Sequence, residues 1–199
     1  METLIVFQNI LIGNALAFLV LIPTTSLFID MGFVLKGVLY TISFGAVFLV
    51  MLVRPLADIF TEQLWLRRLV ILRKGLGILS ASIIVGFMLS AIIAPESIYS
   101  QSLFTVDFYS FDNYRFFAHI GDISGFILLI TSNIFSQKLL KRNWKRIQRL
   151  SYVYFYAGGI YEAFALKSMF AFYALLIVTA LTTLAWAAKI LRRNLVLGS

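Results

Sequence analysis

Hydrophobic residues along this chain gather into six long stretches, which short polar or basic segments separate. The stretches fall near residues 4–28, 32–53, 69–94, 118–136, 150–167 and 169–190. A helix needs about 20 mostly apolar residues to cross a bilayer. The first, third and sixth stretches are long enough to cross with some tilt, whereas the fourth and fifth also contain polar groups. The pattern predicts an all-α polytopic membrane protein, a bundle of six transmembrane helices.

The connections between these stretches support the same division of the chain. Only Leu166, Lys167 and Ser168 separate the fifth stretch from the sixth, so a tight hairpin must join them. Pro23 and Pro55 lie near predicted helix ends. A proline residue also follows the third stretch at position 95, where a helix is expected to stop.

The basic residues alternate between the two ends of this predicted bundle. Of the 17 lysines and arginines, only Lys36, Arg115 and Lys167 fall at one end, and the other 14 fall at the opposite end. These 14 are Arg54, Arg67, Arg68, Arg73, Lys74, Lys138, Lys141, Arg142, Lys145, Arg146, Arg149, Lys189, Arg192 and Arg193. Cytoplasmic loops carry the excess of Lys and Arg, so the split predicts an N-in/C-in topology.

Composition limits the class of protein further. Hydrophobic residues make up 61% of the 199 residues and charged residues only 13%, which predicts one transmembrane domain over residues 1–199. The chain has no cysteine, which excludes disulfides and thiolate metal sites. Its net charge of +8 follows the loops rather than forming a nucleic-acid surface, so lipid rather than nucleic acid is the expected partner. No cleavable signal peptide is evident.

One connection, near residues 96–117 at the end with few basic residues, is rich in aromatic side chains. Amphipathic rings favour the depth of the membrane interface, so an aromatic belt along the membrane is the simpler interpretation. The alternative is a docking surface for another membrane or exoplasmic subunit.

Several short motifs occur in a fixed order along residues 35–190. They are Arg54-Pro55-Leu56-Ala57, Leu72-Arg73-Lys74-Gly75-Leu76-Gly77, Thr131-Ser132, Lys141-Arg142-Asn143-Trp144 and Trp144-Lys145-Arg146-Ile147-Gln148 followed by Tyr152. Taken together, the ordered set resembles the ferric-reductase-like transmembrane domain of the MsrQ (YedZ) type. This resemblance implies a b-type haem protein of electron transport, found largely in the bacterial inner membrane, with axial histidines on the third and fifth helices.

The histidines that the family uses are missing from this chain. Carried over by position, they fall at Phe87 on the third helix and at Gln148 and Tyr161 on the fifth. Phenylalanine cannot ligate iron, and glutamine and tyrosine are uncommon haem ligands. The only histidine is His119, which does not match a family ligand position. A haem held by His119 with Met88 or Tyr161 remains chemically conceivable, but no cofactor is the expectation.

Aromatic residues offer a physical account of a haem-free chain. Phe87 and Tyr161 are bulky, and Tyr154, Tyr156 and Phe164 lie near them along the sequence. Such rings can fill the space that a macrocycle would occupy and restore interior packing. We therefore expect a collapsed version of the fold without haem.

Polar groups within the fourth and fifth stretches form a second candidate site. Asp122 and Glu162 are acidic residues inside predicted spans, and His119 shares a helix face with Asp122. A carboxylate at mid-bilayer costs about 2.5–3.5 kcal/mol, so these groups should face the bundle interior. They suggest either a proton relay or interhelical hydrogen bonds. No metal site is expected.

Glycines in the same two stretches predict close helix packing. Gly121 and Gly125 form a GxxxG pattern, and Gly158 and Gly159 are adjacent on the fifth stretch. Small residues allow two helix backbones to approach closely in lipid.

Three functions remain compatible with the sequence. The first is a non-catalytic scaffold or docking subunit of a membrane complex that has lost its haems. The second is a membrane electron-transfer subunit with unusual haem ligation. The third is a small transporter or proton channel that uses the intramembrane carboxylates. The missing ligands favour the first.

Overall fold

The computed structural model describes residues 2–29, 32–93 and 114–197, and every regular element in this part of the chain is a helix. The long helices are α1 (Glu2–Phe28), α2 (Phe33–Ile59), α4 (Leu72–Ile93), α6 (Arg115–Thr131), α9 (Leu150–Ile160) and α10 (Met169–Leu197). A π-helical segment, η2 (Tyr161–Ala165), continues α9. The short helices are α3 (Leu64–Leu69), α7 (Ile134–Leu140) and α8 (Arg142–Ile147).

Four of the helices found among the described residues, α1, α2, α4 and α10, are long and apolar enough to cross a membrane. These helices expose many large apolar side chains, for which contact with lipid is favourable and contact with water is not. The fourth and fifth predicted spans are also helical, yet shorter: α6 has 17 residues, and α9 has 11 before the five π-helical ones. The membrane-helical class is confirmed, and the count of six spans stays a prediction.

Several helix boundaries differ from those predicted, and α10 continues to Leu197 instead of stopping near residue 190. Helix α2 continues through Pro55 to Ile59 instead of stopping near residue 53, so Pro55 lies inside the helix. Helix α6 stops at Thr131 instead of residue 136. The side chain of Asn133 accepts a hydrogen bond from the backbone N–H of Ser136 at 2.6 Å and so caps the start of α7.

The predicted hairpin between residues 165 and 169 is present. Lys167 has a positive φ of 54°, which reverses the chain within three residues. The hydroxyl of Ser168 accepts a hydrogen bond from the backbone N–H of Ala171 at 3.3 Å, so Ser168 caps α10. The aromatic connection near 96–117 lies outside the described residues up to residue 113.

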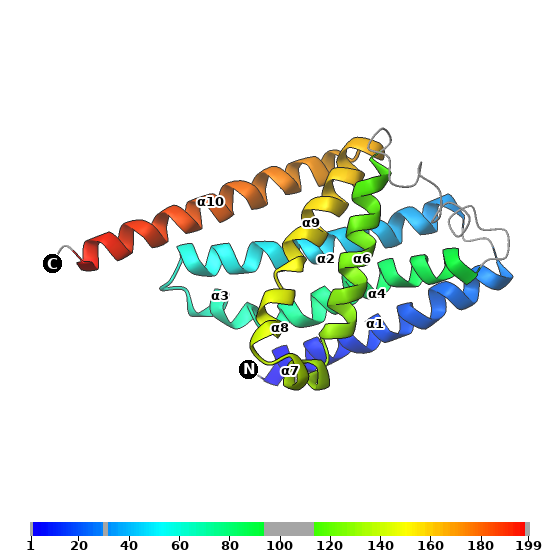
Figure 1. Ribbon diagram of the computed structural model, residues 1–199, viewed down its shortest axis with the longest axis horizontal. Helices are drawn as coiled ribbons and strands as arrows, with labels where there is room; N and C mark the ends of the chain where they lie inside the picture. The colour runs from blue at the N-terminus through cyan, green and yellow to red at the C-terminus, as the bar shows by residue number, and fades with distance from the viewer. Residues whose placement is uncertain (1, 30–31, 94–113, 198–199) are drawn as a thin grey trace.

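The two termini lie toward the same end of the molecule, together with α3, α7 and α8 (Figure 1). We call this the basic end, because α3, α7, α8 and the segments beside them carry most of the lysines and arginines. Arg192 near the end of α10 donates hydrogen bonds to the carbonyls of Asp58 and Ile59, which ties α10 to the end of α2. Which side of the membrane this end faces stays a prediction.

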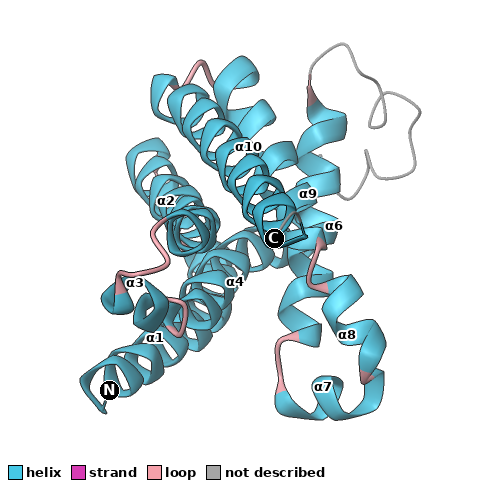
Figure 2. Cartoon of the chain, turned by 90° about the vertical axis from the view of Figure 1, so that its left-hand side faces the viewer, coloured by secondary structure: helices cyan, strands magenta, loops and turns pink. Residues whose placement is uncertain are grey.

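Helices α6 and α9 run side by side and cross the other long helices steeply (Figure 1). Seen from the basic end, α7 and α8 stand apart from α1 and α3 (Figure 2).

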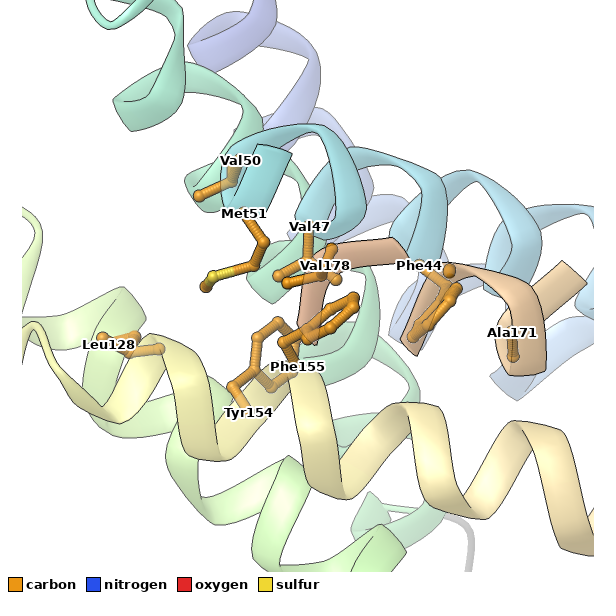
Figure 3. Close-up of a cluster of buried hydrophobic side chains, with 10 residues drawn as sticks. Phe44, Val47, Val50, Met51, Leu128, Tyr154, Phe155, Ala171 and Val178 are labelled. Carbon is orange, nitrogen blue, oxygen red and sulfur yellow. The ribbon is translucent and has the colours of Figure 1, made fainter. Parts of the chain in front are cut away.

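The main core lies where α2, α9 and α10 meet α6. Figure 3 shows Phe44, Val47 and Met51 of α2 facing Tyr154 and Phe155 of α9. Phe155 has no exposed surface and stacks on Phe44 with 5.6 Å between the ring centroids. Val178 of α10, also without exposed surface, closes this cluster.

A second core joins α1 to α4, and Leu39 of α2 completes it. Ala15 of α1 and Ile83 of α4 are fully buried there. A Cβ on Gly75 would meet Leu11 at 3.2 Å, and one on Gly86 would meet Ile22 at 3.2 Å. Small residues on α4 thus let α1 approach closely, as is usual for helix pairs in lipid.

Candidate functional site

Three hydroxyl groups from three helices meet at the centre of the molecule. The Tyr154 hydroxyl on α9 lies 2.8 Å from the Ser80 hydroxyl on α4 and 3.5 Å from the Ser43 hydroxyl on α2. Ser43 also donates to the carbonyl of Ser80 at 3.1 Å. All three residues are buried. This cluster, the central hydroxyl network, bridges α4 and α9 directly, and the sequence analysis did not find it.

Phe87, the family ligand position on α4, does not face α9. Its ring stacks on Tyr40 of α2 with 4.6 Å between centroids and an interplanar angle of 13°. It also packs against the cluster that joins α1 to α4. Phe87 is thus held by apolar contacts on the side of α4 toward α1 and α2.

Gln148, the next family position, lies before α9 rather than on it. It follows α8 at the basic end, and its side-chain amide donates to the Thr131 hydroxyl at 3.4 Å. Beside it, the Trp144 indole donates to the Thr131 carbonyl at 2.9 Å. These two bonds fasten α8 to the end of α6.

Tyr161, the third family position, begins the π-helical segment η2. The backbone N–H of Leu166 donates to the Tyr161 carbonyl at 3.3 Å, a bond that spans five residues. Such π-turns are rare and often occur at functional sites. Phe87 and Tyr161 therefore both lie near Tyr40, whereas Gln148 lies apart at the basic end, and none of the three supplies an imidazole to iron.

The aromatic filling predicted from the sequence is only partly correct. Tyr154 lies in the core at 7% exposure, whereas Phe164 is 49% exposed. Phe164 stacks instead on Tyr114, which precedes α6. Tyr156 is half-buried, and its hydroxyl bonds Thr179 of α10 at 3.0 Å. The bulk that fills the interior is thus Tyr154 with Phe155, and Phe164 was wrongly included.

The predicted intramembrane polar residues lie toward the end opposite the basic end. His119 on α6 is buried at 8% exposure, while Asp122 and Glu162 are half-buried. Tyr40 on α2 lies within electrostatic range of Asp122, Tyr161 and Glu162. The structure therefore brings Asp122 and Glu162 into one neighbourhood and adds Tyr40, which the sequence analysis missed.

The glycines predicted to pack helices lie between α6, α9 and α10. A Cβ on Gly121 would lie 3.5 Å from the backbone nitrogen of Gly158, so these two backbones are close. One on Gly125 would lie 3.0 Å from the Tyr154 ring. A Cβ on Gly159 would lie 2.7 Å from Leu175 of α10, which is closer than van der Waals contact. A glycine at this position avoids that clash.

A cavity of about 610 Å³ opens at the basic end between α2, α4, α8 and the start of α9. We call it the basic cavity. The cations in its wall are Arg54, Arg73, Lys74, Lys145 and Arg149. In the sequence these residues indicate topology, and four of them also belong to the motifs of the resemblance, but nothing there marks them as one site. One feature could have indicated a site: Arg73 and Lys74 lie within the first turn of α4 rather than in the connection before it.

Across residues 2–29, 32–93 and 114–197, no group of three or more histidines, cysteines or acidic residues could hold a metal ion.

No family model, characterised protein or solved structure matches the chain. The resemblance to the ferric-reductase-like domain therefore depends on the ordered motifs alone.

Proposed function

We propose that this chain is a haem-free membrane subunit that serves as a scaffold or docking subunit of a larger complex. Its ancestry would be a ferric-reductase-like domain of the MsrQ type. The observation that carries the proposal is the 2.8 Å hydrogen bond between the Tyr154 and Ser80 hydroxyls. This bond joins α4 to α9, the two helices between which family members hold haem.

Three features of the described residues support the absence of haem. Phe87 has no lone pair to give iron, and its ring is engaged with Tyr40. Phe155 next to Tyr154 is fully buried, so the neighbouring interior is filled. To admit a macrocycle, the chain would have to separate helices that the central hydroxyl network and this ring now join. The residues present therefore do not fit the group.

A spectrum of the purified protein tests this proposal. The chain is expressed with excess haem and purified in mild detergent, and the expected result is no Soret band at stoichiometric intensity. A full Soret band would overturn the haem-free proposal and favour the electron-transfer alternative. His119→Ala is the matched variant, because loss of such a band in it would assign the ligand to the one histidine.

A subunit role also predicts a stable partner. Native purification from the source membrane is expected to retain at least one other protein at fixed stoichiometry through size-exclusion chromatography. Recovery of a lone monomer in every mild detergent would contradict the scaffold role even if haem is absent.

A second candidate function comes from the polar neighbourhood of Tyr40, Asp122 and Glu162. Intramembrane carboxylates near one another often mark proton or ion pathways. The π-helical backbone at Glu162 adds to this candidate. Proton flux into liposomes would support it only if Asp122→Asn and Glu162→Gln abolish the flux. Flux that survives both substitutions would exclude this relay.

A further inference from the structure

The basic cavity concentrates positive charge without an acidic partner in its wall. Its five cations come from three parts of the chain, and none of the residues that line it is aspartate or glutamate. One of the five cations, Arg54, pairs with Asp58 outside the wall at 4.0 Å, where both side chains are more than half exposed. Such exposed pairs contribute little. Like charges around one cavity repel each other, and an anion bound between them would remove that repulsion.

The cavity wall is held in place by hydrogen bonds. The half-buried Arg73 donates from Nε to the carbonyl of Val50 at 3.1 Å, which fixes its guanidinium against α2. A guanidinium has five N–H donors, and this bond uses one of them. Across the cavity, the bonds from Trp144 and Gln148 to Thr131 fix α8 on α6. Hydrogen bonds therefore fix Arg73 itself and the backbone segment that carries Lys145 and Arg149, while the other four cations extend from this frame as exposed side chains.

The inner wall of the cavity is apolar. Val47 and Val50 of α2, Ile78 of α4 and Leu128 of α6 line it together with the ring of Tyr152. Inorganic phosphate would gain nothing from such a wall. A ligand with a charged head and a hydrocarbon chain matches both parts, with its head at the cations and its chain along the valines and leucine.

The position of the cavity identifies the ligand class further. It lies toward one end of helices that are long enough to cross a membrane. Lipid headgroups occupy that depth, and basic pockets between transmembrane helices bind anionic headgroups. Trp144 in the wall is a residue type enriched at the same depth.

We propose that the basic cavity is a binding site for one anionic phospholipid of the adjoining leaflet. The phosphodiester is held by Arg73, Lys74 and Arg149, and one acyl chain lies along Val47, Val50 and Leu128. This proposal does not depend on the scaffold role, because a haem protein or a transporter could hold the same lipid.

The experiment measures lipid retention by native mass spectrometry. The protein is reconstituted in nanodiscs of phosphatidylglycerol and phosphatidylcholine in equal amounts, then released with its bound lipid. The test variant is Lys74→Gln with Arg149→Gln. The matched control is Arg68→Gln with Arg146→Gln, two cations at the same end that are exposed like Lys74 and Arg149 but do not line the cavity. Both variants lose two positive charges.

Wild type is expected to retain phosphatidylglycerol over phosphatidylcholine. The cavity pair should lose affinity by about 30-fold, the effect of two basic residues beside an anionic headgroup. The control pair should lose less than about threefold at physiological salt, because charges outside the cavity are screened from the headgroup. Equal losses in the two variants would overturn the proposal. If the cavity pair fails to fold, Lys74→Gln and Arg68→Gln are compared alone.

Two further probes separate the lipid from a free anion. Glycerol phosphate and inorganic phosphate carry the head without the chain. Each is expected to compete with phosphatidylglycerol only at concentrations at least 100-fold higher, since neither can use the apolar wall. Competition by either at equal concentration would assign the cavity to a free phosphate compound and overturn the lipid proposal.

Discussion

Helix α9 starts beside an open cavity lined by cations and continues into a closed, mostly apolar core. At its start, Arg149 and Tyr152 line an open cavity with five cations, Tyr154 lies between the cavity and the core, and Phe155 has no exposed surface. In the closed core, hydroxyls, glycines and aromatic rings from different helices contact one another. The open cavity instead brings like charges near one another. Neutral polar groups can satisfy each other inside a bundle, whereas like charges cannot pack together without a counter-charge.

This contrast explains why the cavity survives in a chain that otherwise packs closely. Closing it would bring Arg73 and Lys74 against Lys145 and Arg149 and remove all four from water. Desolvating unpaired charges costs more than the contacts would return. The cost of bringing the cations together and desolvating them thus keeps the cavity open. Complementary side-chain packing keeps the core closed.

The largest effect is expected from emptying the closed core. Phe155→Ala removes a ring with no exposed surface and leaves a void among α2, α9 and α10. We expect the free energy of unfolding to fall by about 3 kcal/mol, measured by detergent-induced unfolding in micelles. Phe135→Ala is the control, because that ring is 74% exposed and its loss should change stability by about 0.5 kcal/mol or less. Similar losses in both variants would show that the core is not closed.

The next effect compares two adjacent glycines on α9. Gly159→Ala places a Cβ 2.7 Å from Leu175 and 3.2 Å from Phe44, so overpacking should destabilise the fold by about 1–3 kcal/mol. Nothing lies within 4 Å of a Cβ on Gly158. Gly158→Ala should therefore stabilise the helix by up to about 1 kcal/mol through propensity. The same unfolding assay measures both, and equal signs for the two variants would be inconsistent with this packing.

A smaller effect is expected from the central hydroxyl network. Tyr154→Phe removes the hydroxyl that bonds Ser80, while the ring stays in place. Hydrogen bonds between membrane helices contribute about 0.6 kcal/mol on average, and we expect a loss of that size. Tyr156→Phe removes an exposed bond to Thr179 and should change stability less. A larger loss from Tyr156→Phe than from Tyr154→Phe would argue that the network does not hold α4 and α9 together.

The smallest effect on stability is expected in the basic cavity. In neutral detergent, Lys74→Gln with Arg149→Gln should change the free energy of unfolding by less than about 0.5 kcal/mol, or raise it, because repulsion is relieved. Added phosphatidylglycerol should stabilise wild type, since a ligand of the folded state shifts the equilibrium toward it, and should stabilise this variant less. A marked loss of stability without lipid would show that these cations support the fold itself.

Much of the fold could be predicted from the sequence because its signal is local. The apolar stretch near 69–94 became α4 at Leu72–Ile93, and the hairpin at residues 166–168 was correctly read from its length. Helix ends were less certain where side chains decide them. The predicted stretch ending at 136 divided into α6 and α7, because Asn133 caps a new helix.

The candidate sites were predictable only in part. The spacing of His119 and Asp122 identified one helix face, but the nearness of Tyr40 to Asp122 and Glu162 depends on how three elements cross. The role of Phe164 was wrong for a similar reason. Its position near Tyr161 in the chain did not reveal that it turns outward toward Tyr114.

The sequence by itself determined that this chain is a membrane protein of apolar helices and which segments form them. Backbone hydrogen bonds in lipid must close within each helix, so a long apolar run decides its own structure. The tertiary structure alone decided which side chains meet. Tyr154 bonds Ser80 from 74 positions away along the chain, and the five cations of the basic cavity come from helices that only packing brings together. Such contacts depend on helix rotation and crossing, which no local pattern of residues specifies.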